Sequence, residues 1–411
     1  MNPDKINLIY YKLNDNQYRI YDPYTNYGTF KTVPHTDYRK IKKRYEMLAG
    51  YENSDNGLLM YYKDFKIWNQ ELLSHYNVHK SHLTYFMFKD NNDLNIVETF
   101  YNFSKNVYDL KYNHYDVIDY KESKWFEWCN NGGLMWCDSG IYNCYGYDYN
   151  SFFPRLLGTN KFKLQIPLNR GREIKLKTLD YNNIKFGFYK VNIDCSNKRF
   201  LFNYSKDNTY THYSLLDAIK HQKEFDIKIE LNNDLEYNAY VYEDKDLIYT
   251  YEIFGVWFNE LNGFKQKHPK NKLIKHLMSS LWGSLSKKNV IYVKEDDLEN
   301  YEYGFTERDN LEYVWIDSNS NLNNRYFTLV KREQPYKYNI RLKPFLLSYS
   351  RSIMTEIALN NHPNEIVRIM VDNIVYKSNV SFSVEDMNKE DKTTGYIHFK
   401  NVMKYDVIPK P

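Results

Sequence analysis

Two aspartates, far apart in the sequence, stand where carboxylates could hold metal ions. Asp148 ends an aromatic stretch that predicts a strand, and the residues after it predict a helix, so its side chain is expected to project from a strand end. Asp372 lies between two apolar runs at a predicted hairpin tip, where an unpartnered buried charge would be costly. Mg²⁺ prefers carboxylate oxygens, and two such ions can stabilise both oxygens of a phosphoryl displacement. The simpler interpretation is that Asp148 caps a helix and Asp372 shapes a turn.

A helical stretch between the two aspartates adds cations that could bind phosphate. Leucines recur every four positions and predict one buried stripe, made of Leu273, Leu277, Leu281 and Leu285. Spacings of three and four residues place another set on a second face, namely Lys272, Lys275, Ser279 and Trp282. A triphosphate could lie along the lysines with its base against Trp282, where Gly283 leaves room. The alternative is an ordinary amphipathic helix with a solvated basic side.

The elements that must position these residues mix strands and helices, and the first 124 residues show no repeat. The Gly132-Gly133 pair predicts a turn at which the backbone can approach a ligand closely. Strand-like alternation predominates over residues 161–251. The other expected elements are a strand and helix start over 141–157, a helix over 260–285, short strands over 290–330 around a polar turn at 317–324, a helix over 343–359, and two strands over 365–377 that meet at Asp372-Asn373.

Length and composition limit the class of protein. At 411 residues the chain exceeds one ordinary domain, so two or three lobes with a large cleft are expected. The 56 Lys and Arg residues against 52 Asp and Glu residues give a net charge of +4, which excludes a wholly basic coat but allows local basic stripes. The 43 tyrosines accompany many Asn, Lys and Ile residues, so AT-rich codons explain them better than a base-stacking surface over the whole chain.

The sequence predicts an intracellular, non-secreted protein without disulfides. Its four cysteines lack the paired spacing of a zinc site and are too sparse for a disulfide scaffold, so they are expected to be free thiols in a reducing compartment. These are Cys129, Cys137, Cys144 and Cys195. The sequence contains no apolar run of about 18 residues and no signal-peptide core, so neither a membrane span nor secretion is expected.

Four segments, in their order along the chain, resemble the motifs of family B DNA polymerases, of the protein-primed branch found in viruses, phages, organelles and linear plasmids. Residues 147–154 resemble the DxxSLYP motif, residues 272–283 the KxxxNSxYG motif and residues 368–376 the YxDTDS motif. Residues 130–133 resemble the YxGG element, which contacts template DNA in this branch. The resemblance covers residues 125–405, and four motifs in the right order are specific where one would be weak.

The resemblance implies an α+β fold, a right-hand polymerase palm with an antiparallel sheet, helical fingers and strand-rich insertions. It also implies template-directed DNA synthesis, with dNTPs joined to a primer 3′-OH or to a protein-linked primer. The catalytic carboxylates would be Asp148 and Asp372, which with the backbone carbonyl of Tyr149 would hold two Mg²⁺ ions, for which Mn²⁺ can substitute. The implied partners are primer-template DNA, dNTPs and a terminal protein as primer.

The resemblance also assigns residues to the nucleotide and to DNA. Phe153 stands where the family has the Tyr that packs beneath the sugar and excludes a ribose 2′-OH, and Lys275 would hold the triphosphate. The remaining nucleotide-binding residues would be Tyr149, Lys272, Ser279 and Trp282. Gly132 and Gly133 would contact DNA.

Several positions depart from the family pattern. Ser279 replaces an Asn, Trp282 replaces a Tyr, and Asn373 replaces a Ser. Met370 stands where the first Asp of DTD belongs, although Asp372 keeps the carboxylate that usually binds the metals. A catalytically inactive nucleic-acid-binding paralogue or fragment is therefore the alternative function. An RNA polymerase or reverse transcriptase is a third hypothesis, against which the KxxxSSxWG segment and Phe153 both argue.

The motifs divide the chain into four predicted parts. Residues 1–124 have no assigned function and contain no DxE pair, so an exonuclease remnant without proofreading is expected. Residues 125–258 form a first palm part with a strand-rich insertion, residues 259–289 the fingers helix, and residues 290–411 a second palm part. A thumb with its KxY motif is missing or incomplete before Pro411, which predicts weak processivity. Lys275 is expected to face both aspartates across one cleft.

Overall fold

The structure is a computed structural model, and its chain divides into two compact units. The units are Met1–Tyr108 with Ile253–Ser284, and Asp109–Glu252 with Leu285–Pro411. The structure describes three strands near the N-terminus, Phe100, and residues 116–197, 201–267, 272–304, 312–321 and 324–408. The predicted lack of an exonuclease in residues 1–124 therefore falls mostly outside the described residues, and the predicted division into four parts stays a prediction.

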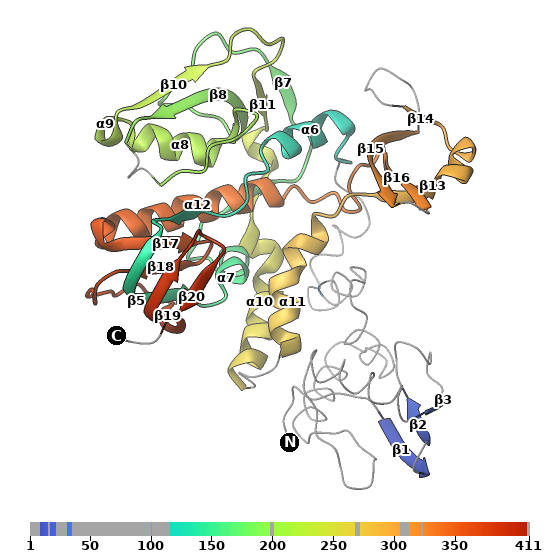
Figure 1. The fold of residues 1–411 in the computed structure, drawn as a ribbon. Coiled ribbons are helices and arrows are strands. Elements are labelled where there is room, and N and C mark those ends of the chain that lie inside the picture. The colour runs from blue at the N-terminus through green and yellow to red at the C-terminus, as the bar shows by residue number, and fades with distance from the viewer. Residues whose placement is uncertain are drawn as a thin grey trace. The chain divides into compact units, whose positions relative to one another are not determined.

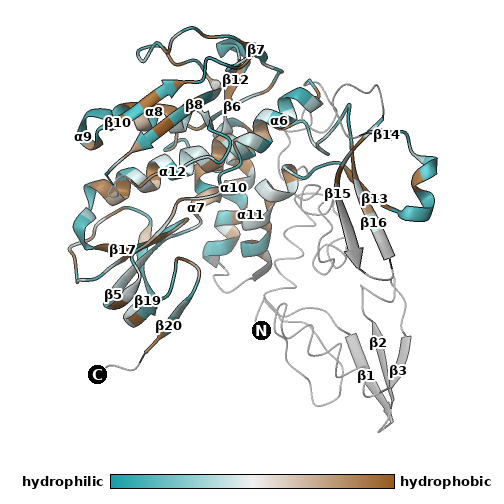
Figure 2. Cartoon of the chain, turned by 45° about the horizontal axis from the view of Figure 1, so that its top comes forward, coloured by the Kyte–Doolittle hydropathy of each residue, from teal (hydrophilic) through white to brown (hydrophobic). Residues whose placement is uncertain are grey.

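The first unit contains a small sheet and a pair of helices. Strands β1 (Ile9–Asn14), β2 (Gln17–Tyr21) and β3 (Lys31–Pro34) form an antiparallel sheet in that order. Helices α10 (Thr250–Lys267) and α11 (Lys272–Leu285) lie side by side (Figures 1 and 2). The helix expected over 260–285 is thus two helices, and the first begins ten residues earlier than predicted.

A six-stranded antiparallel sheet forms the centre of the second unit, in the order β20-β19-β5-β18-β17-β4 (Figure 1). Its strands are β4 (Met135–Cys137), β5 (Gly140–Tyr149), β17 (Ile366–Met370), β18 (Asn373–Tyr376), β19 (Met387–Phe399) and β20 (Tyr405–Val407). The apolar side chains of one face form a core cluster of Cys144, Val367, Val375, Ile397 and Phe399. The central strand β5 therefore pairs with β18 on one side and with β19 on the other. Both partners lie more than 200 residues later in the chain.

A second sheet forms a lobe of the same unit, in the order β10-β8-β11-β7 with β9 beside β8. Its elements are β7 (Arg172–Ile174), β8 (Gly187–Cys195), β9 (Thr209–Thr211), β10 (Ile227–Leu231), β11 (Ala239–Val241), α8 (His212–Lys220) and α9 (Gln222–Phe225). Buried and exposed residues alternate along β10, and Figure 2 shows the corresponding change of hydropathy. The sequence predicted the strands but not α8, which begins where the Thr211 side chain accepts a hydrogen bond from the Ser214 amide.

Helix α12 (Lys343–Asn360) lies between this lobe and the central sheet (Figure 1). It contacts α8 and β9 of the lobe and α7 (Phe152–Gly158), the helix that follows β5. The predicted helix over 343–359 is confirmed. Among the helices that the structure describes, none is long and apolar enough to cross a membrane.

The remaining elements of the second unit connect or extend these layers. A four-stranded sheet has the order β13-β16-β15-β14, with β13 (Val290–Lys294), β14 (Tyr303–Gly304), β15 (Tyr313–Asn321) and β16 (Asn324–Lys331). The polar turn expected at 317–324 is shorter than predicted, because β15 continues to Asn321 and β16 begins at Asn324. Other elements are α6 (Tyr120–Trp128) and the strand pair β6 (Gln165–Pro167) and β12 (Leu247–Tyr249). The cysteines Cys129, Cys137, Cys144 and Cys195 are free, as predicted.

A buried histidine at the start of α8 makes stability depend on pH. The His212 ring lies 3.9 Å from the Phe186 ring, and its Nδ1 has no hydrogen-bond partner among the described residues. Burial lowers the pKa of His212 to about 3. Above pH 6.5 the ring is neutral in both folded and unfolded chains, and below it only the unfolded chain takes up the proton, so stability is lost as pH falls.

His212→Phe is expected to remove this pH dependence. Between pH 7.5 and pH 5 the wild type should lose about 2 kcal/mol of unfolding free energy that the variant retains. Urea unfolding of both proteins at the two pH values measures the difference, and the carboxylates that titrate in both proteins cancel in it. Equal pH dependence of the two proteins would contradict the assignment.

Candidate active site

The two predicted aspartates lie at the same end of the six-stranded sheet, Asp148 on the central strand β5 and Asp372 in the turn directly before the adjacent strand β18. Asp148 of β5 is opposite Asn373 of β18 in the antiparallel register. The next residue, Tyr149, donates its backbone N–H to the backbone carbonyl of Asp372, at 2.8 Å. Both aspartates are partly exposed. Pairing of β5 with β18 thus brings two aspartates that are 224 positions apart (372 − 148) to the same end of the sheet.

The turn that carries Asp372 is unusually tight. The Asp372 N–H donates to the Met370 carbonyl at 2.8 Å, so the hairpin turns through Val371 as a γ-turn. Val371 has a φ of 62°, a conformation that costs a β-branched residue roughly 1–3 kcal/mol. The tip is therefore Val371-Asp372, one residue earlier than the predicted Asp372-Asn373. The Val371 N–H is in turn held by the Leu134 carbonyl, at 2.8 Å.

The Gly132-Gly133 loop lies against this hairpin tip. A Cβ on Gly133 would stand 3.0 Å from the Val371 methyl groups, so glycine allows the loop and the tip to meet. Gly132 has a φ of 58°, and its carbonyl accepts a hydrogen bond from the buried Arg351 guanidinium of α12. The Gly133 carbonyl accepts from the Asn203 amide, at 2.6 Å. Loop, hairpin tip and α12 are consequently held as one assembly.

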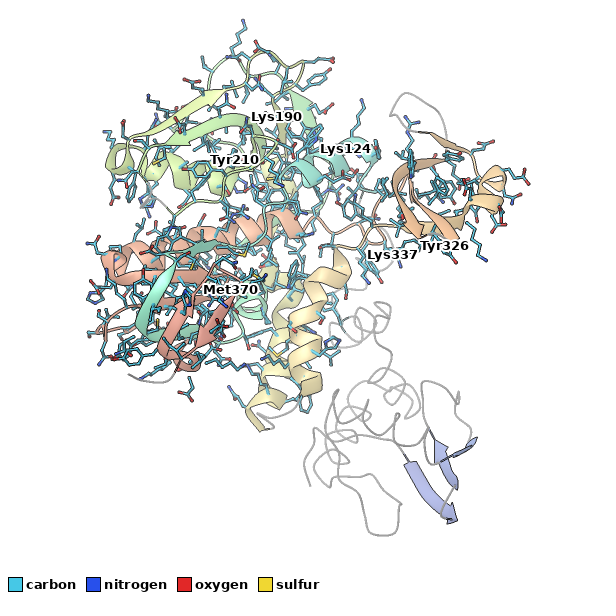
Figure 3. All side chains as sticks on the ribbon, in the orientation of Figure 1. Lys124, Lys190, Tyr210, Tyr326, Lys337 and Met370 are labelled. Carbon is cyan, nitrogen blue, oxygen red and sulfur yellow. The ribbon has the colours of Figure 1, made fainter. Side chains whose placement is uncertain are left out.

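A row of side chains crosses the sheet through Asp148. Met370 is opposite Asn373, Asn373 is opposite Asp148, and Asp148 is also opposite Asn388 of β19. Met370, at the end of β17 (Figure 3), has the guanidinium of Arg368 against its sulfur. Arg368 is buried and also approaches the Asn373 side-chain oxygen, at 3.4 Å. The position where the family pattern has its first Asp thus holds a thioether beside a guanidinium.

The helix after β5 positions the remaining residues of the first motif. Ser151, with a φ of 54°, is the N-cap of α7, so the interpretation that Asp148 caps this helix is wrong. The Tyr149 side chain is buried, and its ring packs on Phe152 at 4.8 Å. Phe153 is partly exposed and contacts Phe152 at 5.6 Å. Tyr149 therefore directly follows Asp148 at the end of β5, and the Phe153 ring belongs to the first turn of α7.

Two cations near the end of β5 are paired with carboxylates. The Arg155 guanidinium lies 3.0 Å from Asp386, and the Lys161 ammonium lies 2.6 Å from Glu385 and 3.4 Å from Asp386. The Asp386 carbonyl also accepts the Asn150 N–H, at 2.9 Å. These ion pairs hold the segment before β19, which contains Glu385 and Asp386, next to the end of β5.

The second predicted motif lies on α11, in the first unit. Leu277, Leu281 and Leu285 are buried as predicted, and Ile274 and Met278 widen the apolar stripe. On the other face Lys275 and Ser279 are exposed, and Trp282 is partly exposed. The side chains of Lys272 and Leu273 lie outside the described residues. The structure therefore groups Asp148, Tyr149, Phe153 and Asp372 in one unit, and Lys275, Ser279 and Trp282 in the other.

The fold was compared with known proteins. No protein-family model matches the chain, and no curated protein matches it. Among solved structures, phi29 DNA polymerase complexed with single-stranded DNA matches with a TM-score of 0.57 and 12% sequence identity, covering 97% of this chain and 71% of that chain. The ternary complex of phi29 DNA polymerase with primer-template DNA and incoming nucleotide matches with a TM-score of 0.53 and 11% identity, covering 97% and 72%. The chain has the fold of a DNA polymerase.

The predicted α+β fold class is thereby confirmed, and the site around Asp148 and Asp372 belongs to a polymerase fold. Identities of 11–12% support the fold alone, so the roles of single residues remain predictions. The donor set at the sheet end consists of two aspartate carboxylates with the Tyr149 backbone between them, and both aspartates are partly exposed. Such oxygen donors with room for water fit Mg²⁺, which keeps part of its hydration shell.

Residues that the sequence did not single out also shape this site. Arg351 binds the glycine loop from 219 residues away, and Arg368 lies behind the row that contains Asp148. Glu390 of β19 accepts a hydrogen bond from the Asn373 amide, at 3.0 Å. An arginine within an otherwise apolar helix or strand could have marked Arg351 and Arg368 in the sequence as residues that support the site. The position of Glu390 relative to the motifs gave no such indication.

Proposed function

We propose that the protein is a template-directed DNA polymerase, related to the protein-primed family B enzymes, that joins dNTPs to a primer end. One observation carries the proposal. In a DNA polymerase fold, Asp148 of β5 and Asp372, directly before the adjacent strand β18, lie at the same end of the sheet, where the Tyr149 N–H donates to the Asp372 carbonyl. The four sequence motifs support the same conclusion, because they depend on residue types and spacing alone.

Each residue of the site has a specific task in this proposal. Asp148, Asp372 and the Tyr149 carbonyl would hold two Mg²⁺ ions, which supply charge stabilisation to the attacking and leaving oxygens. Phe153 lies in the first turn of α7 and would limit space beneath the sugar, so deoxyribonucleotides are preferred. Lys275, exposed on α11, would bind the triphosphate, and Trp282 of the same helix would stack near the nascent base pair. Lys272 and Ser279 complete that face.

DNA is the expected macromolecular partner. The phi29 polymerase structures that share this fold contain single-stranded or primer-template DNA. In this chain the Gly132-Gly133 loop, anchored by Arg351 and packed on Val371, would contact the template next to the metal site. A terminal protein would supply the primer hydroxyl. Because the loop and the hairpin tip touch, the template and the metals would be positioned by one rigid assembly.

A second candidate function is nucleic-acid binding without catalysis. Met370 favours it, since the polymerase pattern has a carboxylate at that position and the Arg368 guanidinium occupies the space beside it. A protein of this kind would bind primer-template DNA through the same residues and would not extend it.

Primer extension separates the two candidates. The purified full chain is mixed with a labelled primer-template and Mg²⁺, and extension with dNTPs is compared with extension with rNTPs and with a reaction containing a chelator. The proposal predicts chelator-sensitive extension that prefers dNTPs. DNA binding without extension, both in the wild type and in a Met370→Asp variant that restores the missing carboxylate, would support the binding protein and contradict the polymerase.

A further inference from the structure

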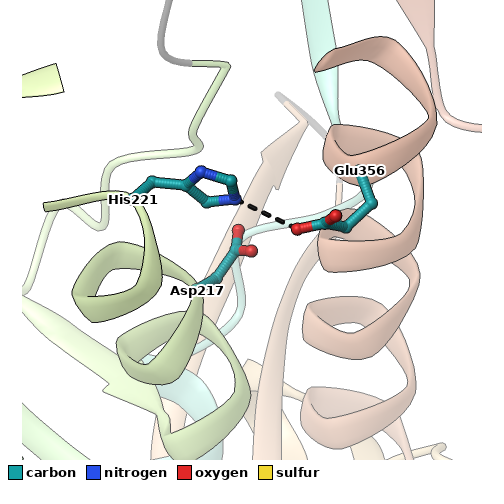
Figure 4. A group of neighbouring side chains, drawn as sticks. All are labelled: Asp217, His221 and Glu356. Atoms are coloured by element: carbon teal, nitrogen blue, oxygen red, sulfur yellow. Dashed lines mark hydrogen bonds and ion pairs between the residues drawn. The ribbon is translucent and has the colours of Figure 1, made fainter. Parts of the chain in front are cut away.

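A cluster of metal-ligating side chains lies outside the proposed active site, where α8 meets α12. Asp217 lies in the last turn of α8, and His221 directly follows the helix. The two residues are four positions apart, so both side chains point to the same side. Glu356 comes from α12. One ligand atom from each residue lies within 4.8 Å of the other two, and the His221 Nε2 is 3.0 Å from the nearer Glu356 oxygen. Figure 4 shows the three side chains pointing toward one another.

Asp217 is the most buried carboxylate of the cluster. The residue is 8% exposed, and the charged groups that act on it are His221, Glu356, Lys220 and Arg351. The carboxylate points toward the His221 ring and Glu356 (Figure 4). Holding this largely buried carboxylate close to the second carboxylate of Glu356 is costly, and a cation bound between them and His221 would offset that cost.

The surroundings of His221 resemble those of a metal ligand. Its Nδ1 lies 3.3 Å from the Glu224 carboxylate of α9, and a proton on Nδ1 would free the Nε2 lone pair for a metal in place of its present 3.0 Å contact with Glu356. Metal-bound histidines commonly donate their other ring nitrogen to a carboxylate in this way. The helix turn therefore provides a ligand together with the group that orients it.

We infer that Asp217, His221 and Glu356 form a Zn²⁺ site that fastens α8 of the strand-rich lobe to α12. One imidazole and two carboxylates are a donor set that Zn²⁺ accepts, with a fourth position open to water. Ligands at about 2.1 Å from a tetrahedral Zn²⁺ are roughly 3.4 Å apart. The three atoms lie within 4.8 Å of one another, so no pair needs to approach by more than about 1.4 Å (4.8 − 3.4). Mg²⁺ prefers all-oxygen, octahedral sites and is not expected to bind here.

Lys220 competes with the metal for one ligand. Its ammonium pairs with the same Glu356 oxygen that approaches His221, and its side chain is largely exposed and able to leave. The second nearby cation, Arg351, is already engaged by the Gly132 carbonyl and the Ser214 hydroxyl. Removing the Lys220 charge should therefore strengthen metal binding, whereas it should weaken a cluster held together only by ion pairs.

Zinc binding to the full chain tests the inference. Isothermal titration and elemental analysis are expected to give one Zn²⁺ per chain. Asp372→Asn, which alters the proposed active site, should bind the same amount of Zn²⁺. Asp217→Asn and His221→Gln should each weaken binding by at least about 100-fold, and Glu224→Gln by about 10- to 100-fold. Lys220→Gln should tighten it roughly two- to fivefold, the effect of one exposed ion pair. Asp226→Asn, an exposed aspartate just after α9, is the matched control and should change nothing.

Three outcomes would overturn the inference. One is an absence of zinc binding in the wild type, and another is zinc binding that is lost in Asp372→Asn but kept in Asp217→Asn. The third is weaker binding in Lys220→Gln. Lys220 and Glu224 are exposed, so these two variants should fold even if substitution of the buried ligands does not allow folding.

Discussion

Asp372→Asn is expected to lower Mg²⁺-dependent extension by at least about 100-fold without unfolding the protein. The loss of activity should be at least this large, because removing even an outer partner of a metal ligand lowers metal affinity or activity by about 10- to 100-fold. Asparagine keeps the size of the side chain and the γ-turn hydrogen bond, which is made by the backbone. Because Asp372 is partly exposed, the unfolding free energy should change by no more than about 0.5 kcal/mol.

Two further variants make this result specific. Asp148→Asn should be as inactive as Asp372→Asn, and the double variant should be no worse than either, since both residues serve one unit of chemistry. Asp406→Asn, on the outer strand β20 where the carboxylate pairs with Lys400, should extend primers normally. Steady-state extension and thermal unfolding of all four variants are the measurements. Retention of more than a tenth of the activity in Asp372→Asn would remove this residue from the metal site.

Arg341→Met is expected to destabilise the second unit by about 3–5 kcal/mol. The Arg341 guanidinium and the Glu122 carboxylate of α6 are both fully buried and form two parallel hydrogen bonds, of 2.7 and 2.9 Å. The Tyr242 hydroxyl donates to the same carboxylate, at 2.7 Å. Arg341 also donates to the carbonyls of Asp116 and Leu168. Removing the guanidinium leaves Glu122 as a buried carboxylate without its counter-charge.

Urea unfolding followed by tryptophan fluorescence measures this loss. Arg341→Met with Glu122→Gln should lose less than the sum of the two single variants, because the double variant buries no uncompensated charge. Lys400→Met removes the exposed ion pair with Asp406 and should cost no more than about 1 kcal/mol. A loss below 1 kcal/mol in Arg341→Met would mean that water reaches the pair on local opening.

Local signals predicted the elements that carry the site. The aromatic alternation that ends at Asp148 gave β5 and the start of α7, and the helical period gave α12. The tip of the second hairpin was misplaced by one residue because a positive φ at Val371 contradicts the preference of valine and is imposed from outside. The short helix α8 lay unrecognised in a strand-rich stretch, although Thr211 offered an N-cap signal.

Contacts between distant residues could not be predicted from local patterns. The resemblance to known motifs placed Asp148 and Asp372 in one site, but the pairing of β5 with β18 was not predicted. Nothing in the sequence connects Gly132 to Arg351 or Asp148 to Asn388, since these contacts depend on how complete layers pack. The same limit applies to the Zn²⁺ site, where the i and i+4 spacing of Asp217 and His221 is visible but Glu356 is not.

The position of β5 in the middle of its sheet also affects biosynthesis. Its neighbours, β18 and β19, begin at Asn373 and Met387, so the ribosome must add 224 residues (373 − 149) after Tyr149 before the first of them exists. At about 5–20 residues per second this takes roughly 10 to 45 seconds. During that time a tyrosine-rich strand has both edges open to other nascent chains. Slower translation beyond α7, or synthesis at high temperature, should therefore favour aggregation over folding, and chaperones that shield extended segments should raise the yield of folded protein.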